Sequence, residues 1–134
     1  MTKKDDAELV EGFDLIHSYS RQQAIEDGVL VDVTETAREA GFRDPVALTA
    51  TVFGAYVEVP HGVTGQDADG RLWDLLWMLR HAIRRDSEGG PVLLFRVLVR
   101  NSETTPPRLV TLKSVCGPGD DGELVITIML PDED

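Results

Sequence analysis

The sequence is poor in cysteine and in long apolar runs, and both shortages exclude whole classes of protein. A single cysteine, Cys116, cannot form an intrachain disulfide framework or an all-cysteine zinc site. The longest apolar stretches, LWDLLWML and PVLLFRVLV, fall far short of the roughly 20 residues that cross a bilayer. No apolar segment follows the two lysines of MTKKDDAELVEG, as a secretory signal would require. We therefore expect a cytoplasmic protein that does not engage a membrane.

Motifs that hold phosphates, nucleophiles or metals are also missing. The chain has no GxxxxGK[ST] or GxGxxG segment to cradle a phosphate, and no GxSxG nucleophile elbow. Its three histidines, His17, His61 and His81, lack the spacing of a helical or finger-like metal site. We accordingly expect no cofactor, no bound metal and no catalytic residues of a known pattern.

Basic residues are scarce, and the acidic excess is unevenly distributed. There are 13 lysines and arginines against 24 aspartates and glutamates, which gives a net charge of −11. Residues 1–70 carry −9 and residues 114–134 carry −6, whereas residues 71–113 carry +4. A chain of this charge is repelled by phosphate backbones, so direct nucleic-acid binding is not expected.

The first half of the sequence reads as mainly helical. Ser20 followed by Gln23 forms a capping-box pattern, and Pro45 at a first helical position favours a helix that continues to about Val57. The clearest amphipathic pattern lies in RLWDLLWMLRHAIRR, whose leucines recur at helical spacing. The predicted elements are a helix that begins at 21 and is stopped by Gly28, helices at 35–40 and 45–57, a long helix at 71–85 opened by Asp69 and Gly70, and a short strand at 29–33. Residues 1–12 are predicted to be a flexible N-terminal arm, and residues 13–134 a single α+β domain.

Three strand-like runs, 92–100, 108–116 and 123–131, follow the long helix and are separated by short loops with turn residues. Consecutive strands joined in this way are typical of an antiparallel meander. The sequence therefore predicts an α+β fold, with a helical N-terminal half packed on one face of a small C-terminal antiparallel β-meander. The strand at 29–33 could add an edge to that sheet.

Two groups of side chains are the candidate protein-binding residues. Tryptophan and arginine are common anchors of protein interfaces, and Trp73 and Trp77 lie one helical turn apart, near several arginines. The C-terminal acids could face a basic cleft on a target. This acidic set consists of Asp120, Asp121, Glu123, Asp132, Glu133 and Asp134.

Four motifs together carry a family resemblance: DLIHSYSRQQAIEDGVLVDV, TAREAGF with Pro45 just after it, LVTLKSVCGPGDDGE and ITIMLP. The chain resembles a bacterial domain family of unknown function that is carried on conjugative plasmids and integrated mobile elements. The resemblance implies that the protein serves such an element, for which small acidic proteins often inhibit host defences.

The leading hypothesis is therefore a non-enzymatic accessory protein that binds a host protein. The expected partner is a nucleic-acid-binding defence complex, such as a CRISPR effector or a restriction enzyme, and the acidic side chains could imitate DNA. One alternative is a small enzyme with a site around Asp14 and His17, completed by a distant group such as His61. Another is a structural or regulatory oligomer, joined along an exposed edge strand or through Trp73 and Trp77.

Overall fold

The computed structural model describes residues 19–134, and the described chain begins with the predicted capping box. The Ser20 side chain accepts a hydrogen bond from the Gln23 backbone N–H, the Gln23 side chain accepts one from the Ser20 N–H, and helix α2 (Arg21–Glu26) follows. Strand β1 (Leu30–Asp32) and helix α3 (Thr34–Glu39) come next, close to the predicted positions. The predicted arm at residues 1–12 lies outside the described residues.

The helix predicted from Pro45 to Val57 is wrong. Residues Val46–Thr49 form strand β2, and only then does the chain coil through α4 (Ala50–Val52) into a π-helical turn, η1 (Phe53–Val57). Val46, Ala47 and Leu48 are completely buried, which suits a strand covered on both faces. Thr49 ends the strand and caps α4, since its hydroxyl accepts a hydrogen bond from the Val52 N–H.

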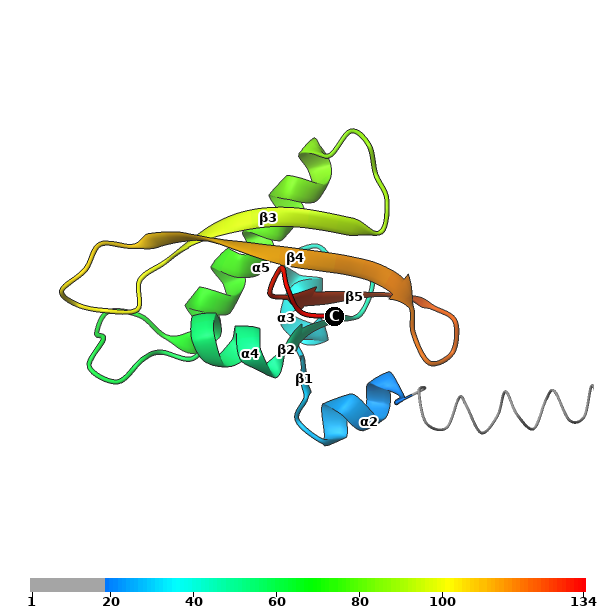
Figure 1. Cartoon of the computed structure of the whole chain (residues 1–134), viewed down its shortest axis with the longest axis horizontal. Helices are drawn as coiled ribbons and strands as arrows, with labels where there is room; N and C mark the ends of the chain where they lie inside the picture. The colour runs from blue at the N-terminus through cyan, green and yellow to red at the C-terminus, as the bar shows by residue number, and fades with distance from the viewer. Residues whose placement is uncertain (1–18) are drawn as a thin grey trace, which may run out of the picture.

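The predicted antiparallel meander is also wrong, because β2 is inserted beside the C-terminal strands. Among the described residues, five strands form one mixed sheet in the order β1-β2-β5-β4-β3. Strands β3 (Val92–Val99), β4 (Arg108–Pro118) and β5 (Leu124–Met129) do pair antiparallel in sequence. However, β5 pairs parallel with β2, with Val46 opposite Ile126, and β1 pairs antiparallel with β2 at one edge. The N-terminal region thus holds most of the helices but also supplies two strands (Figure 1).

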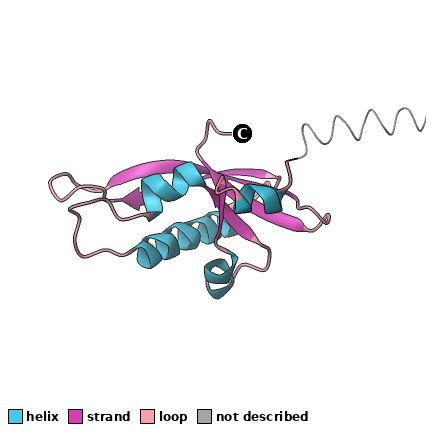
Figure 2. Cartoon of the chain, turned by 90° about the horizontal axis from the view of Figure 1, so that it is seen from below, coloured by secondary structure: helices cyan, strands magenta, loops and turns pink. Residues whose placement is uncertain are grey.

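Helix α5 (Ala68–Arg85) covers one face of this sheet, hereafter the inner face (Figure 2). The Asp67 side chain accepts a hydrogen bond from the Gly70 N–H and begins the helix. The helix buries one stripe against Phe95, Val97 and Val99 of β3. The buried leucines of that stripe are Leu72, Leu75, Leu76 and Leu79. None of the helices described is both long and apolar enough to span a membrane.

Candidate protein-binding surface

The six predicted acidic residues do not form one cluster. Asp120, Asp121 and Glu123 lie in the hairpin before β5, whereas residues 132–134 follow its end. Six residues of strand separate the two groups, a length of about 20 Å. The acids therefore form two small groups at opposite ends of β5.

Half of these acids also have structural partners. Asp120 accepts hydrogen bonds from the backbone N–H groups of Arg21 (2.8 Å) and Gln22 (3.0 Å), so it binds the start of α2, and these bonds lower the pKa of its carboxyl. Glu123 accepts from the Asp121 N–H within the hairpin. Glu133 accepts from the Thr49 hydroxyl and the Leu130 N–H, both at 2.8 Å, and so closes the turn after β5. Asp121, Asp132 and Asp134 have no such bonds within residues 19–134.

Trp73 and Trp77 are brought together on α5. Their rings stack with centroids 6.2 Å apart, and the Arg80 guanidinium lies 5.7 Å from the Trp77 ring centroid. Arg80 also fills the space beside Gly41, where an added Cβ would lie 2.7 Å from its Cζ atom. The two indoles therefore contact each other and Arg80 within the chain, and both remain exposed, so a role in binding stays a prediction.

A different apolar surface lies on the outer face of the sheet, opposite α5. Register places the side chains of Val92, Leu94, Arg96 and Leu98 on this face of β3. The outward side chains of β4 are those of Leu109, Thr111, Lys113 and Val115. We call these eight side chains the open face. In Figure 1, β3 and β4 cross in front of α5, and none of the helices of residues 19–134 lies over them.

The open face is unusually apolar for a surface. Leu94 and Leu109 are each 57 % exposed, Leu98 is 62 % exposed, and Leu98 stands directly opposite Leu109. On β5, by contrast, the outward Val125 and Met129 are buried, so the exposure is confined to the β3–β4 part of the face. Contiguous exposed apolar side chains of this kind typically mark a protein-binding site.

The backbone of β3 adds a second feature to this surface. β3 is the last strand of the described sheet, and its main packing partners within residues 19–134 are β4 and α5. A groove of about 300 Å³ runs between α5 and β3 beside this edge. Apolar residues such as Met78, Ala82, Leu93 and Phe95 line it together with His81, Arg85, Asp86 and Arg96.

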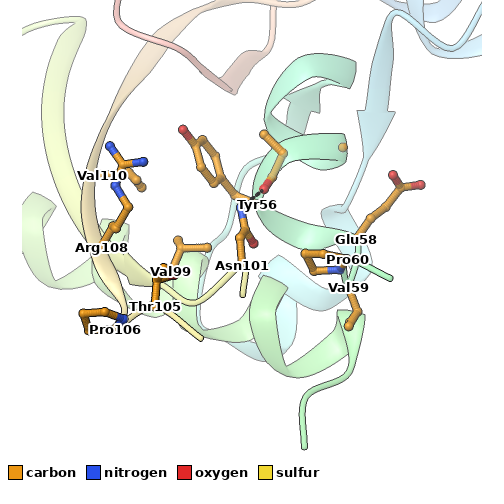
Figure 3. A pocket seen from close by; sticks show the side chains of 12 residues that line it. Tyr56, Glu58, Val59, Pro60, Val99, Asn101, Thr105, Pro106, Arg108 and Val110 are labelled. Atoms are coloured by element: carbon orange, nitrogen blue, oxygen red, sulfur yellow. Dashed lines mark hydrogen bonds between the residues drawn. The ribbon is translucent and has the colours of Figure 1, made fainter. Parts of the chain in front are cut away.

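A larger cleft, of about 560 Å³, lies on the inner side between η1 and the loop that follows β3 (Figure 3). Asn101, in the loop after β3, donates a hydrogen bond to the Ala55 carbonyl of η1 at 2.9 Å and so connects the two walls. Its charged groups do not converge, because the Glu58 carboxylate points away from the wall that carries Arg108 (Figure 3). The two charged side chains of the lining, Glu58 and Arg108, therefore lie on separate walls of the cleft.

A buried arginine donates hydrogen bonds to two residues that line this cleft, Tyr56 and Asn101. Arg71 is 7 % exposed and donates to the carbonyls of Tyr56 and Arg100 and to the side chains of Gln66 and Asn101. Desolvation lowers the pKa of its guanidinium. No carboxylate lies within ion-pair distance of it in residues 19–134, so neutral oxygens alone solvate this charge.

The alternative enzyme site receives no support from the described residues. Asp14 and His17 lie outside them, and His61 is exposed in the loop between η1 and α5. Residues 19–134 contain no group of three or more histidine, cysteine or acidic side chains that could hold a metal ion. Burial and the nearby charge of Asp44 raise the pKa of the Cys116 thiol, which disfavours a thiolate.

A family model matches residues 7–134, which include all of the surfaces described above. The chain belongs to the DUF6573 family. This is described as a family of unknown function, so membership of DUF6573 assigns no residue a role. No curated protein and no solved structure matches the chain.

The sequence reasoning missed the open face, which carries four of the exposed large apolar side chains of this DUF6573 chain, Val92, Leu94, Leu98 and Leu109. A signal was present, because VLLFRVLV is apolar at both odd and even positions. A strand with one face in water normally alternates apolar and polar residues. This departure from alternation indicates a strand whose second face is also apolar and available for contact.

Proposed function

We propose that this protein acts by binding another protein through the open face. The observation that carries the proposal is the Leu98–Leu109 pair, which lies at adjacent positions of two strands with more than half of each side chain exposed. Leaving such side chains in water costs free energy that burial under a partner would recover, about 25 cal/mol per Å².

The charges of the open face define the chemistry of the partner. Arg96 and Lys113 flank the leucines, and none of the eight side chains is acidic, although the chain as a whole carries −11. Lys113 donates to the Glu133 carbonyl, which leaves Arg96 as the more available cation. The complementary surface is therefore apolar at its centre and carries carboxylates at its rim.

The biological partner that we propose is a host defence protein, such as a CRISPR effector or a restriction enzyme. The resemblance to proteins of conjugative plasmids and integrated mobile elements supports this context, and an inhibitory binder needs no active site of its own. The chain would then act as an anti-defence accessory protein in the bacterial cytoplasm.

Acidic mimicry of DNA is a second mode of binding for the same proposed role, supported by the −6 charge of residues 114–134. Asp121, Asp132 and Asp134 would carry it, because Asp120, Glu123 and Glu133 hold the fold together. The two modes use different residues and are separable by mutation.

The test is protection of a transforming plasmid in bacteria that carry one defined restriction or CRISPR system, followed by binding to the purified complex. We expect the wild-type chain to raise transformation and Leu109→Lys to abolish this effect. Affinity should fall at least about 30-fold, as for truncation of an interface hot spot. The matched control is Val29→Lys, a similarly exposed apolar residue away from the open face, which should leave binding unchanged.

Salt distinguishes the two modes. Binding through leucines should persist at high ionic strength, whereas binding through Asp121, Asp132 and Asp134 should weaken steeply. The triple variant Asp121→Asn, Asp132→Asn, Asp134→Asn completes the comparison. If neither Leu109→Lys nor this triple variant changes a measured protection, the proposed binding surface is wrong.

A further inference from the structure

We infer that β3 of this protein pairs antiparallel with β3 of a second copy, joining two five-stranded sheets into one continuous sheet. The inference stands apart from the identity of any defence partner. It rests on the backbone of β3, on the contrast between the two edges of the sheet and on the position of one charge.

The backbone groups that point away from β4 can be assigned from one hydrogen bond. The Cys116 N–H donates to the Pro91 carbonyl at 2.7 Å, so residues 91 and 116 form a hydrogen-bonded pair. Such pairs recur at every second position of an antiparallel ladder. Residues 93, 95, 97 and 99 therefore bond to β4. Val92, Leu94, Arg96 and Leu98 direct their N–H and carbonyl groups toward the open edge, and their side chains belong to the open face.

This edge lacks the features that normally protect a sheet from pairing. Proteins protect their edges with short strands, charges, prolines or bulges. Strand β3 has eight residues, and Arg96 is its one charged residue. Strand β1, at the opposite edge, has three residues and packs against α2. Of the two edges of the described sheet, the β3 edge is therefore the one suited to pairing, and using it in both copies yields a closed dimer rather than a fibre.

The charge of Arg96 selects the register. A two-fold axis at Phe95 places Leu94 opposite Arg96 of the second copy and Val92 opposite Leu98. All four outward residues then lie in hydrogen-bonded pairs, which gives eight bonds. Moving the axis to Arg96 would set two arginines against each other, which is unfavourable. Moving it to Leu94 would carry Leu98 past the start of the partner strand.

Side chains would extend the contact beyond the backbone. The groove between α5 and β3 borders the pairing edge, and among its lining residues Met78 is 38 % exposed. On the other side of the sheet, the two open faces would join into one apolar surface twice as wide. The dimer would therefore present a larger binding surface than the monomer.

The first experiment measures the mass of the full chain by light scattering over a wide concentration range. We expect a dimer that dissociates on dilution, and a Leu94→Pro variant that associates about tenfold more weakly or worse. This proline removes an N–H that points to the open edge, a position where an edge strand tolerates proline. The matched control is Leu109→Pro, which should still dimerise. Leu109 is equally exposed at 57 %, and its N–H also points away from the β3–β4 ladder, but it lies on β4.

The second experiment tests the register without perturbing the fold. In a Cys116→Ser background, chains with Val92→Cys and chains with Leu98→Cys are mixed and treated with a short thiol cross-linker. The proposed register brings these positions to about 5.5 Å between Cα atoms. The same residue in the two copies would lie about 20 Å apart. We therefore expect cross-linked dimers in the mixture and almost none with either variant alone.

A monomeric wild-type chain at all concentrations would overturn the inference. So would a dimer in which Leu94→Pro and Leu109→Pro weaken association equally, or one in which the mixed cysteine variants fail to cross-link. If Leu94→Pro does not fold, the cross-linking result decides.

Discussion

The two edges of the sheet are built in opposite ways. Strand β1 has three residues, and the neighbouring helix α2 is bound in place through Asp120 and through Arg21, which donates to Thr127 and to the Ile126 carbonyl. Strand β3 has eight residues and an outward face that is almost entirely apolar. The contrast indicates that the first edge only ends the sheet, whereas the second is available for binding.

The contrast continues within β3, where successive residues serve different purposes. Phe95 is 4 % exposed and packs under α5, while its neighbour Leu94 is 57 % exposed. The inner residues secure the strand to the fold. The outer residues add nothing to the core, so binding is the better explanation for their apolar character.

The largest expected effect on stability comes from substituting an inner and an outer residue of β3 in turn. We expect Phe95→Ala to lower the free energy of unfolding by about 3–5 kcal/mol, because it leaves a cavity beneath α5. Leu94→Ala should change it by less than about 0.5 kcal/mol. Urea denaturation at low protein concentration, where any dimer is dissociated, provides the measurement. A comparable loss in both variants would show that the open face belongs to the core.

A second, smaller effect on stability concerns Arg71, which binds the chain at the C-terminal end of β3. Arg71 binds the Arg100 carbonyl just beyond the strand and the Tyr56 carbonyl in η1. Arg71→Met should cost about 2–4 kcal/mol, since it removes the Arg71 donors from the part-buried Tyr56 carbonyl and Asn101 side-chain oxygen and leaves the Arg100 carbonyl with Gln66 as its remaining side-chain donor. Arg84→Met, on the exposed side of the same helix, should change stability by less than about 0.5 kcal/mol. Equal stability of the two variants would contradict the role given to Arg71.

Local signals in the sequence were sufficient for the helices at both ends of the helical region. The capping box at Ser20 and Gln23 and the leucine spacing of α5 depend on residues within a few turns of one another, and both helices were found. Helix α5 begins at Ala68, after the Asp67 cap, and not at the predicted Asp69 and Gly70. The three C-terminal strands were also found, because turn residues separate them. Short stretches of sequence are therefore enough to predict these elements.

The sheet topology could not be predicted in this way. Residues 46–49 read as the start of a helix after Pro45, since a short apolar run has no period of its own. They become a strand because Val46 and Leu48 find Ile126 and Ile128, about 80 residues away. That pairing places β2 beside β5 and turns the expected meander into a mixed sheet.

The binding surface was hidden for a related reason. The predicted acids are charged side chains at loop positions, which a sequence shows directly, but Asp120, Glu123 and Glu133 proved to bond within the chain. Whether Leu98 and Leu109 are covered depends on where helices pack. Within residues 19–134, α5 packs on one face of β3, and the other face is left open.

The smallest expected effect concerns the β1 edge of the sheet, which α2 covers. Asp120→Ala should free the start of α2, and hydrogen exchange of the Arg21 and Gln22 amides should become faster. Asp121→Ala, the adjacent control, should leave both amides protected. Because the native pKa of Asp120 lies below its unfolded value near 4, its contribution is fully present above that pH. The contribution is lost as the pH falls through the native pKa.

The same variant tests whether the β1 edge is kept from pairing by α2 or by the short length of β1. If α2 alone blocks β1, then Asp120→Ala should create a second site of self-association, and light scattering would reveal species larger than a dimer. We expect no such species, because three residues offer too few hydrogen bonds to hold a partner strand. Larger assemblies would show instead that α2 protects an edge that is otherwise competent to pair. In that case both edges of the sheet, and not β3 alone, would need to be counted as binding surfaces.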